Sequence, residues 1–137
     1  MTRDEAGAPG LADPRPAVLV VEENVIVRMA LCESLRAAGC RVIEAFGPED
    51  AVKVLRADAG MDVMLTELAL PGVMNGVQLA GLARSLKPQL EVIITSDDLL
   101  DSDGHHLTLY EFMGKPYTMG RLVERIRALT GRSLSAP

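Results

Sequence analysis

The stretch Val63-Met64-Leu65-Thr66-Glu67-Leu68 is an apolar run that carries an acid near its end, and the turn residues Pro71-Gly72 follow it closely. A short apolar run bounded by a turn is typical of a buried β-strand. Glu67 therefore falls at the carboxyl end of a predicted strand. Because open parallel sheets bind ligands just outside the carboxyl ends of their strands, Glu67 is a candidate site residue.

Three other predicted strands also end in polar residues. Val18-Leu19-Val20-Val21 leads directly into Glu22 and Glu23, and two later apolar stretches end at Thr95 and Lys115. Residues this far apart in sequence can share a pocket if the strands run parallel in a doubly wound sheet. The sequence then predicts one polar cluster at four strand ends.

The rest of the chain alternates strand patterns with helix patterns. Asn24 and Thr118 are suitable N-caps for the first and last helices, and Gly39 is a suitable stop for the first. Many residues of the segment 97–106 have weak helix propensity, so the fourth helix is expected to be short or distorted. The patterns predict strands over 17–21, 41–45, 62–68, 90–95 and 107–113, and helices over 25–38, 47–55, 77–86 and 119–130. This alternation predicts the α/β class, with a doubly wound five-stranded parallel sheet and helices on both faces.

The composition excludes several classes of protein. The chain of 137 residues fits one domain, with 48% hydrophobic and 24% charged residues, as in ordinary soluble proteins. No apolar run approaches the ~20 residues of a membrane span, and the polar start lacks a secretory signal, so we expect a cytoplasmic location and no membrane partner. The net charge of −5 and the pI near 5.0 oppose direct nucleic-acid binding.

The ends of the chain and its cysteines predict little chemistry. Residues 1–16 hold prolines and glycines among small and charged residues, which predicts a flexible arm. The ordered domain is expected over 17–131, followed by a polar tail over 132–137. Cys32 and Cys40 fit neither a disulfide framework nor a metal spacing, so we expect reduced, structural thiols.

Taken together, these strand ends resemble the receiver domain of two-component response regulators, the CheY-like family. The resemblance covers about residues 17 to 130. It implies a flavodoxin-like fold of β-α units around a phosphorylation pocket. The motifs that carry it are, in order, Val18-Leu19-Val20-Val21-Glu22-Glu23, Leu65-Thr66-Glu67, Leu70-Pro71-Gly72, Met74-Asn75-Gly76, Ile93-Ile94-Thr95-Ser96 and Phe112-Met113-Gly114-Lys115-Pro116-Tyr117.

The resemblance implies a role for three residues on the last two strands. Thr95 matches the hydroxyl that contacts the phosphoryl group, and Lys115 matches the lysine that pairs with phosphate. Phe112 matches the aromatic switch position. In many receivers the peptide bond between this lysine and the following proline, here Pro116, is cis.

The resemblance also implies a Mg²⁺ site among the acids. Glu22 and Glu23 match the acidic pair, and the metal ligands would be Glu23, Glu67 and the backbone carbonyl of Ala69. Mg²⁺ demands near-octahedral geometry at about 2.0–2.1 Å, whereas all three carboxylates here sit on the longer glutamate side chain. We expect these acids to attract cations but to fit Mg²⁺ poorly.

Glu67 departs from the family pattern, because ordinary receivers carry the phospho-accepting aspartate at this position. The additional methylene moves the carboxylate by roughly 1.5 Å. Misplacements near 1 Å can cost about a hundredfold in rate, so we expect that Glu67 is not phosphorylated in the usual way. The longer side chain can instead engage Lys115 or Thr95 and partly imitate the modified state.

Two functions follow from these observations. The first is a stand-alone receiver, not an enzyme, because no output domain follows the last predicted helix. It would act through contacts with a sensor histidine kinase or phosphotransfer protein, a downstream protein or a second copy of itself. The alternative is a phosphate-accepting carrier in a phosphorelay, with Glu67 or a neighbour such as Thr66 or Ser96 as acceptor. A flavin-binding module is remote, because two glutamates replace a phosphate-binding loop after the first strand.

Overall fold

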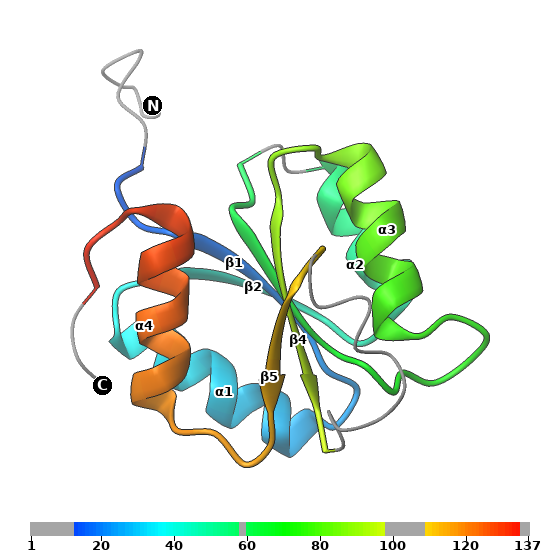
Figure 1. Ribbon diagram of the computed structural model, residues 1–137, viewed down its shortest axis with the longest axis horizontal. Helices are drawn as coiled ribbons and strands as arrows, with labels where there is room; N and C mark the ends of the chain where they lie inside the picture. The colour runs from blue at the N-terminus through cyan, green and yellow to red at the C-terminus, as the bar shows by residue number, and fades with distance from the viewer. Residues whose placement is uncertain (1–12, 58–59, 98–108, 135–137) are drawn as a thin grey trace.

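The structure is a computed structural model that describes residues 13–57, 60–97 and 109–134. Five parallel strands form one sheet in the order β2-β1-β3-β4-β5 (Figure 1). The strands are β1 (Ala17–Val21), β2 (Arg41–Ala45), β3 (Val63–Glu67), β4 (Glu91–Ser96) and β5 (Glu111–Gly114). The helices are α1 (Val25–Ala37), α2 (Pro48–Ala57), α3 (Gly76–Leu86) and α4 (Met119–Thr130). This strand order confirms the predicted doubly wound α/β fold.

The helices cover both faces of the sheet. Figure 1 shows α1 and α4 on one face and α2 and α3 on the other. The label α4 belongs to the last helix, which the sequence predicts as the fifth. The predicted fourth helix over 97–106 lies outside the described residues, apart from Asp97.

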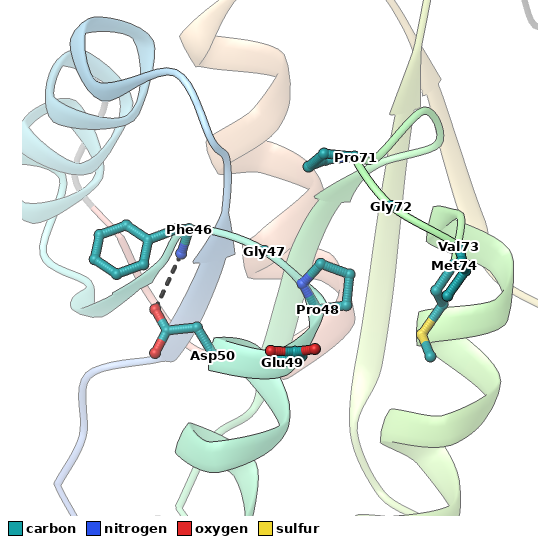
Figure 2. A pocket seen from close by; sticks show the side chains of 9 residues that line it. All are labelled: Phe46, Gly47, Pro48, Glu49, Asp50, Pro71, Gly72, Val73 and Met74. Carbon is teal, nitrogen blue, oxygen red and sulfur yellow. Dashed lines mark hydrogen bonds between the residues drawn. The ribbon is translucent and has the colours of Figure 1, made fainter.

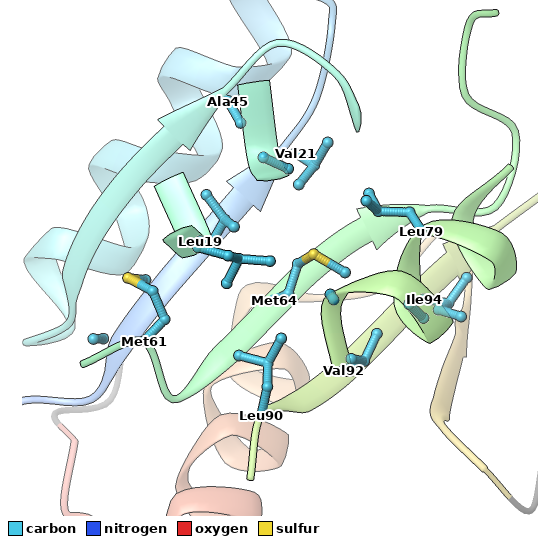
Figure 3. Packing of buried hydrophobic residues seen from close by; sticks show 14 residues of the cluster. Leu19, Val21, Ala45, Met61, Met64, Leu79, Leu90, Val92 and Ile94 are labelled. Carbon is cyan, nitrogen blue, oxygen red and sulfur yellow. The ribbon is translucent and has the colours of Figure 1, made fainter. Parts of the chain in front are cut away.

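Side chains alternate between two hydrophobic clusters along each strand. The first cluster lies between the sheet and α2 and α3 and includes Leu19, Met64 and Ile94 (Figure 3). The second lies on the α1 and α4 face and includes Val20 and Leu65. All five side chains are at most 2% exposed. Because each buried aliphatic side chain contributes about 1.5–3 kcal/mol, the two clusters supply the main stabilisation of the fold.

Local signals in the sequence account for the helix ends. The side chain of Asn24 accepts the amide of Val27 at 3.0 Å, and Thr118 accepts that of Arg121 at 3.1 Å, as expected of N-caps. α1 ends just before Gly39, whose φ of 108° is a conformation that glycine adopts at little cost. The predicted caps and stop are confirmed.

β5 begins later than the sequence predicts. Leu109 and Tyr110 lie outside the strand, and the first pair with β4 joins Ile93 and Glu111. The side chain of Arg84 on α3 explains the difference: its Nη1 donates to the carbonyl of Leu109 at 2.8 Å, and its guanidinium lies 4.9 Å from the centre of the Tyr110 ring. These contacts hold Leu109 and Tyr110 against α3, just before the strand begins.

Residues on either side of the predicted domain borders contact the folded core. The guanidinium of Arg132 donates to the carbonyls of Asp13 and Arg15, both at 2.9 Å. The amide of Arg41 donates to the carbonyl of Pro16 at 2.8 Å. Part of the predicted arm and part of the predicted tail are therefore attached to the sheet and to each other.

Burial controls the chemistry of the two cysteines. Cys32 and Cys40 are buried and unpaired. Burial raises the pKa of each thiol to about 11, so both are protonated near neutral pH and unreactive. Within the described residues, no helix combines the length and the apolar character needed to cross a membrane.

Candidate functional site

The carboxyl edge of the sheet holds a small cavity of about 40 Å³. Four of the residues that the sequence predicts for the site line it: Glu22, Glu67, Thr95 and Lys115. Strand register explains the convergence. β3 and β4 pair Glu67 with Thr95, and β4 and β5 pair Ser96 with the residue before Lys115. The polar cluster predicted at the strand ends is therefore present, and we call this cavity the acidic pocket.

Glu67 and Lys115 form an ion pair across the pocket. The ammonium Nζ of Lys115 donates to Oε2 of Glu67, and the side chains are 29% and 27% exposed. Burial lowers the pKa of Lys115, but the hydrogen bond and charge of Glu67 outweigh it, so the pKa of Lys115 is raised. Partly exposed pairs contribute only about 0.2–1 kcal/mol to stability, so this contact matters more for the geometry of the pocket than for the fold.

Glu22 is the buried acid of the pocket, with 7% exposure. Its Oε2 accepts the amide of Asn24 at 2.9 Å. Burial raises the pKa of Glu22, the Asn24 hydrogen bond opposes that rise, and the charge of Glu67 adds to it. The net effect is an upward shift, so Glu22 takes up a proton more readily than an ordinary glutamate.

We expect Glu22→Gln to stabilise the protein near neutral pH by about 0.2–1 kcal/mol, the size of one cross-strand side-chain contact, because it removes a buried charge that lies beside Glu67. Because the folded-state pKa of Glu22 is raised, the stability linked to its protonation is complete below the unfolded-state pKa and is lost as pH rises through the folded-state pKa. Glutamine does not titrate, so the Glu22→Gln variant does not lose this stability as pH rises. Melting temperatures from about pH 4 to pH 8 should therefore diverge as pH rises.

The matched control for this experiment is Glu23→Gln, because Glu23 is the exposed neighbour of Glu22. It should melt like wild type at every pH. If Glu22→Gln gained as much stability at acidic pH as at neutral pH, this would contradict a raised pKa for Glu22.

The structure does not bring three other predicted residues into the pocket. Glu23 and Ala69 are exposed, and neither lines the cavity. Phe112 is half-buried on the α2 and α3 face of the sheet, where it packs with Tyr110 against the first hydrophobic cluster. The peptide bond between Lys115 and Pro116 is cis, as in many receivers.

The pocket residues do not fit Mg²⁺ in this arrangement. In the part of the chain that the structure describes, no three Asp, Glu, His or Cys side chains form a group that could hold a metal ion. One oxygen of Glu67 already accepts the ammonium of Lys115, which would repel a cation. Mg²⁺ needs several oxygen ligands at about 2.0–2.1 Å, and beside the Lys115 ammonium Glu67 has only its second oxygen to offer.

Arg28 supports the pocket from α1, a role that its place in the sequence did not predict. Its side chain is buried, Nη1 donates to the carbonyl of Glu22 at 2.8 Å, and Nε lies 3.1 Å from Oε1 of Glu44. The guanidinium also lies 4.9 Å from the centre of the Phe46 ring. The one feature of the sequence that could have indicated this role is that Arg28 is a single charged residue in an apolar stretch of helix. Arg28 holds the end of β1 in place.

Tyr117 is a second residue of the pocket that the sequence analysis did not assign. It lines the cavity two residues after Lys115 and packs against the second hydrophobic cluster. Burial raises the pKa of its phenol, Lys115 lowers it, and the charges of Glu67 and Glu22 raise it further. The phenol therefore stays neutral beside the acids.

The sequence of this chain is similar to those of several known regulatory proteins. The alkaline phosphatase synthesis regulator SphR of Synechococcus elongatus is 27% identical over 94% of this chain and 54% of its own length. The swarming motility regulation protein RssB of Serratia marcescens is 30% identical over 84% of this chain and 53% of its own length. The chain thus spans about half the length of these curated relatives.

Solved structures show the same fold. A response regulator receiver protein from Sinorhizobium medicae superposes with a TM-score of 0.76 at 20% identity, over 85% of this chain and 95% of that chain. The receiver domain of the hybrid histidine kinase CckA superposes with a TM-score of 0.70 at 28% identity, over 83% of this chain and 98% of that chain. The family model described as the response regulator receiver domain matches residues 18–127. With this match over most of its length, the chain belongs to the response regulator receiver domain family.

Proposed function

We propose that this receiver domain acts in two-component signalling through protein contacts, without phosphorylation of Glu67 in the usual way. The ion pair between Glu67 and Lys115 carries the proposal. The lysine that would pair with a phosphoryl group is already bound to the residue at the acceptor position. The cavity of about 40 Å³ has room for about two or three water molecules. A phosphoryl group would have to separate this ion pair.

The carboxylate of Glu67 would partly take the place of a phosphoryl group. It puts one negative charge beside Lys115, whereas phosphorylation adds about 1.5 to 2 negative charges and three acceptor oxygens. The imitation is therefore partial. Under this proposal the pocket keeps one ion-paired state whatever the activity of a kinase.

Exposed apolar side chains on α1 support a role in protein contacts. Val25, Ile26 and Met29 lie in its first two turns and are 52%, 75% and 59% exposed. Clustered apolar side chains of this kind mark interaction sites more often than isolated ones do. The partner would be a sensor histidine kinase, a phosphotransfer protein, a downstream protein or a second copy of the chain.

The test is intact-mass spectrometry of wild type after incubation with a small phosphodonor and Mg²⁺. We expect no gain in mass, because the ammonium of Lys115 is already paired with the carboxylate of Glu67 and is not available to the phosphodonor. A phosphoryl adduct on wild type would contradict the proposal and favour the carrier in a phosphorelay.

Hydroxylamine would then identify the acceptor, because it cleaves acyl phosphates but not phosphate esters of hydroxyl groups. An adduct that it removes would lie on a carboxylate such as Glu67. A resistant adduct would point to Thr66 or Ser96. Thr66 is a poor acceptor, since it is 1% exposed and its hydroxyl donates to the carbonyl of Glu67 at 3.1 Å.

A further inference from the structure

A hollow in two adjoining parts lies along α2, on the face of the sheet away from α1, and reaches Leu82 of α3. Its upper part, at the start of α2, has a volume of about 360 Å³ and lies between residues 46–50, which include the first turn of this helix, and the loop 71–74. Figure 2 shows Pro48 and Glu49 on one side of this part and Met74 on the other. Its lower part, of about 340 Å³, shares Pro48, Glu49 and Met74 with the upper part. We call this hollow the α2–α3 groove.

Apolar side chains line most of the groove and remain open to solvent. Val73, at its upper end, is 101% exposed, so no described segment covers it. Phe46 is 63% exposed, but its ring is turned away from Pro48 and Met74 and lies against Arg28 of α1 (Figure 2). Met74 lies at the centre and packs partly against the first hydrophobic cluster. A hydrogen bond of 3.0 Å from the amide of Phe46 to Oδ2 of Asp50 fixes residues 46–50 (Figure 2). The groove is therefore a formed surface.

The charges of the groove are separated along α2. Glu49 and Asp50 lie in its first turn at the upper part, whereas Lys53 and Arg56 line the lower part. Glu49 and Arg56 are seven residues apart on the helix, which corresponds to about 10 Å at 1.5 Å per residue. This span matches about three residues of an extended peptide or two turns of a helix.

We propose that the α2–α3 groove binds a short segment of a partner protein. The segment carries apolar side chains in its middle, a basic residue that meets Glu49 and an acidic residue that meets Lys53 or Arg56. Apolar grooves that accept alternate side chains of a peptide are a common mode of recognition, and flanking charges set the direction of the bound segment. The groove shares no residue with the acidic pocket, so this inference does not depend on the state of Glu67.

The test is selection of a phage-displayed library of random peptides, about ten residues long, on the full chain. Synthetic copies of the selected peptides are then titrated against wild type, Val73→Lys and Ala128→Lys. Val73 is fully exposed, so Val73→Lys should fold normally, and it should weaken binding at least tenfold. Ala128→Lys places the same charge on the exposed surface of α4, on the other face of the sheet, and should leave binding unchanged.

A charge reversal adds a sharper requirement. Selection on Glu49→Lys should replace the basic residue of the enriched peptides with an acidic one. No enrichment on wild type, equal binding to Val73→Lys, or enriched peptides without this charge preference would overturn the proposal. Concentration-dependent self-association in sedimentation that Val73→Lys abolishes would also overturn it, because a second copy would then be the occupant.

Discussion

Glu67→Asp is expected to gain a phosphoryl group from a small phosphodonor with Mg²⁺ at least about a hundredfold faster than wild type. Removing one methylene withdraws the carboxylate from the Lys115 ammonium by roughly 1.5 Å. Lys115 then becomes available to pair with the incoming phosphoryl group, and the register of β3 and β4 keeps residue 67 beside Thr95. Time courses of intact mass measure the difference directly.

Glu67→Gln is the control for this experiment, because it keeps the length of glutamate but lacks a nucleophilic carboxylate. It should remain unmodified. If Glu67→Asp also remains unmodified while its circular dichroism and melting match wild type, the additional methylene is not what prevents the reaction. The glutamates at positions 22 and 23 would then be the next substitutions to make, since they fill the acidic pair.

Gly76→Ala is expected to destabilise the fold by about 2–3 kcal/mol, a typical cost of overpacking. A Cβ atom at this position would lie 2.3 Å from the carbonyl oxygen of Glu67 and 2.9 Å from Cα of Leu68. Both are backbone atoms, and the amide of Gly76 already donates to the carbonyl of Leu68 at 2.7 Å. Neither partner can rotate away, so α3 or the end of β3 must move.

Gly81→Ala in the same helix is the matched control. The nearest atom to its Cβ would be the hydroxyl of Tyr110 at 3.7 Å, an ordinary contact. Replacing this helical glycine should stabilise the protein by about 0.5–1 kcal/mol. Thermal melts should therefore move in opposite directions for the two variants. Equal shifts would show that the close approach of Gly76 to β3 is not decisive.

Local signals predicted most of the fold. The strands 17–21 and 41–45 have the expected bounds, because each is a short run rich in apolar, β-branched residues that ends before turn or cap residues. Asn24 and Thr118 cap their helices as expected, since this contact involves residues only three apart. Parallel pairing of such strands was enough to predict that Glu67 and Lys115 meet.

Contacts between distant residues account for what the sequence did not show. Arg84 and Leu109 shorten β5 through a hydrogen bond across 25 residues, and no local pattern marks it. The contacts of Arg28 depend on β2, which places Glu44 beside its guanidinium. Gly76 follows an asparagine and so resembles a turn residue, whereas in the structure its essential property is the close approach to β3.

The sheet separates two hydrophobic clusters, and this division affects how the family can diversify. Most apolar walls of the acidic pocket, such as Leu65 and Leu31, belong to the cluster shared with α1 and α4. Met74 and Val52 of the α2–α3 groove pack against the other cluster. A lineage can therefore lose phosphorylation chemistry on one side while acquiring a new partner on the other, because each layer can accumulate substitutions without repacking its neighbour.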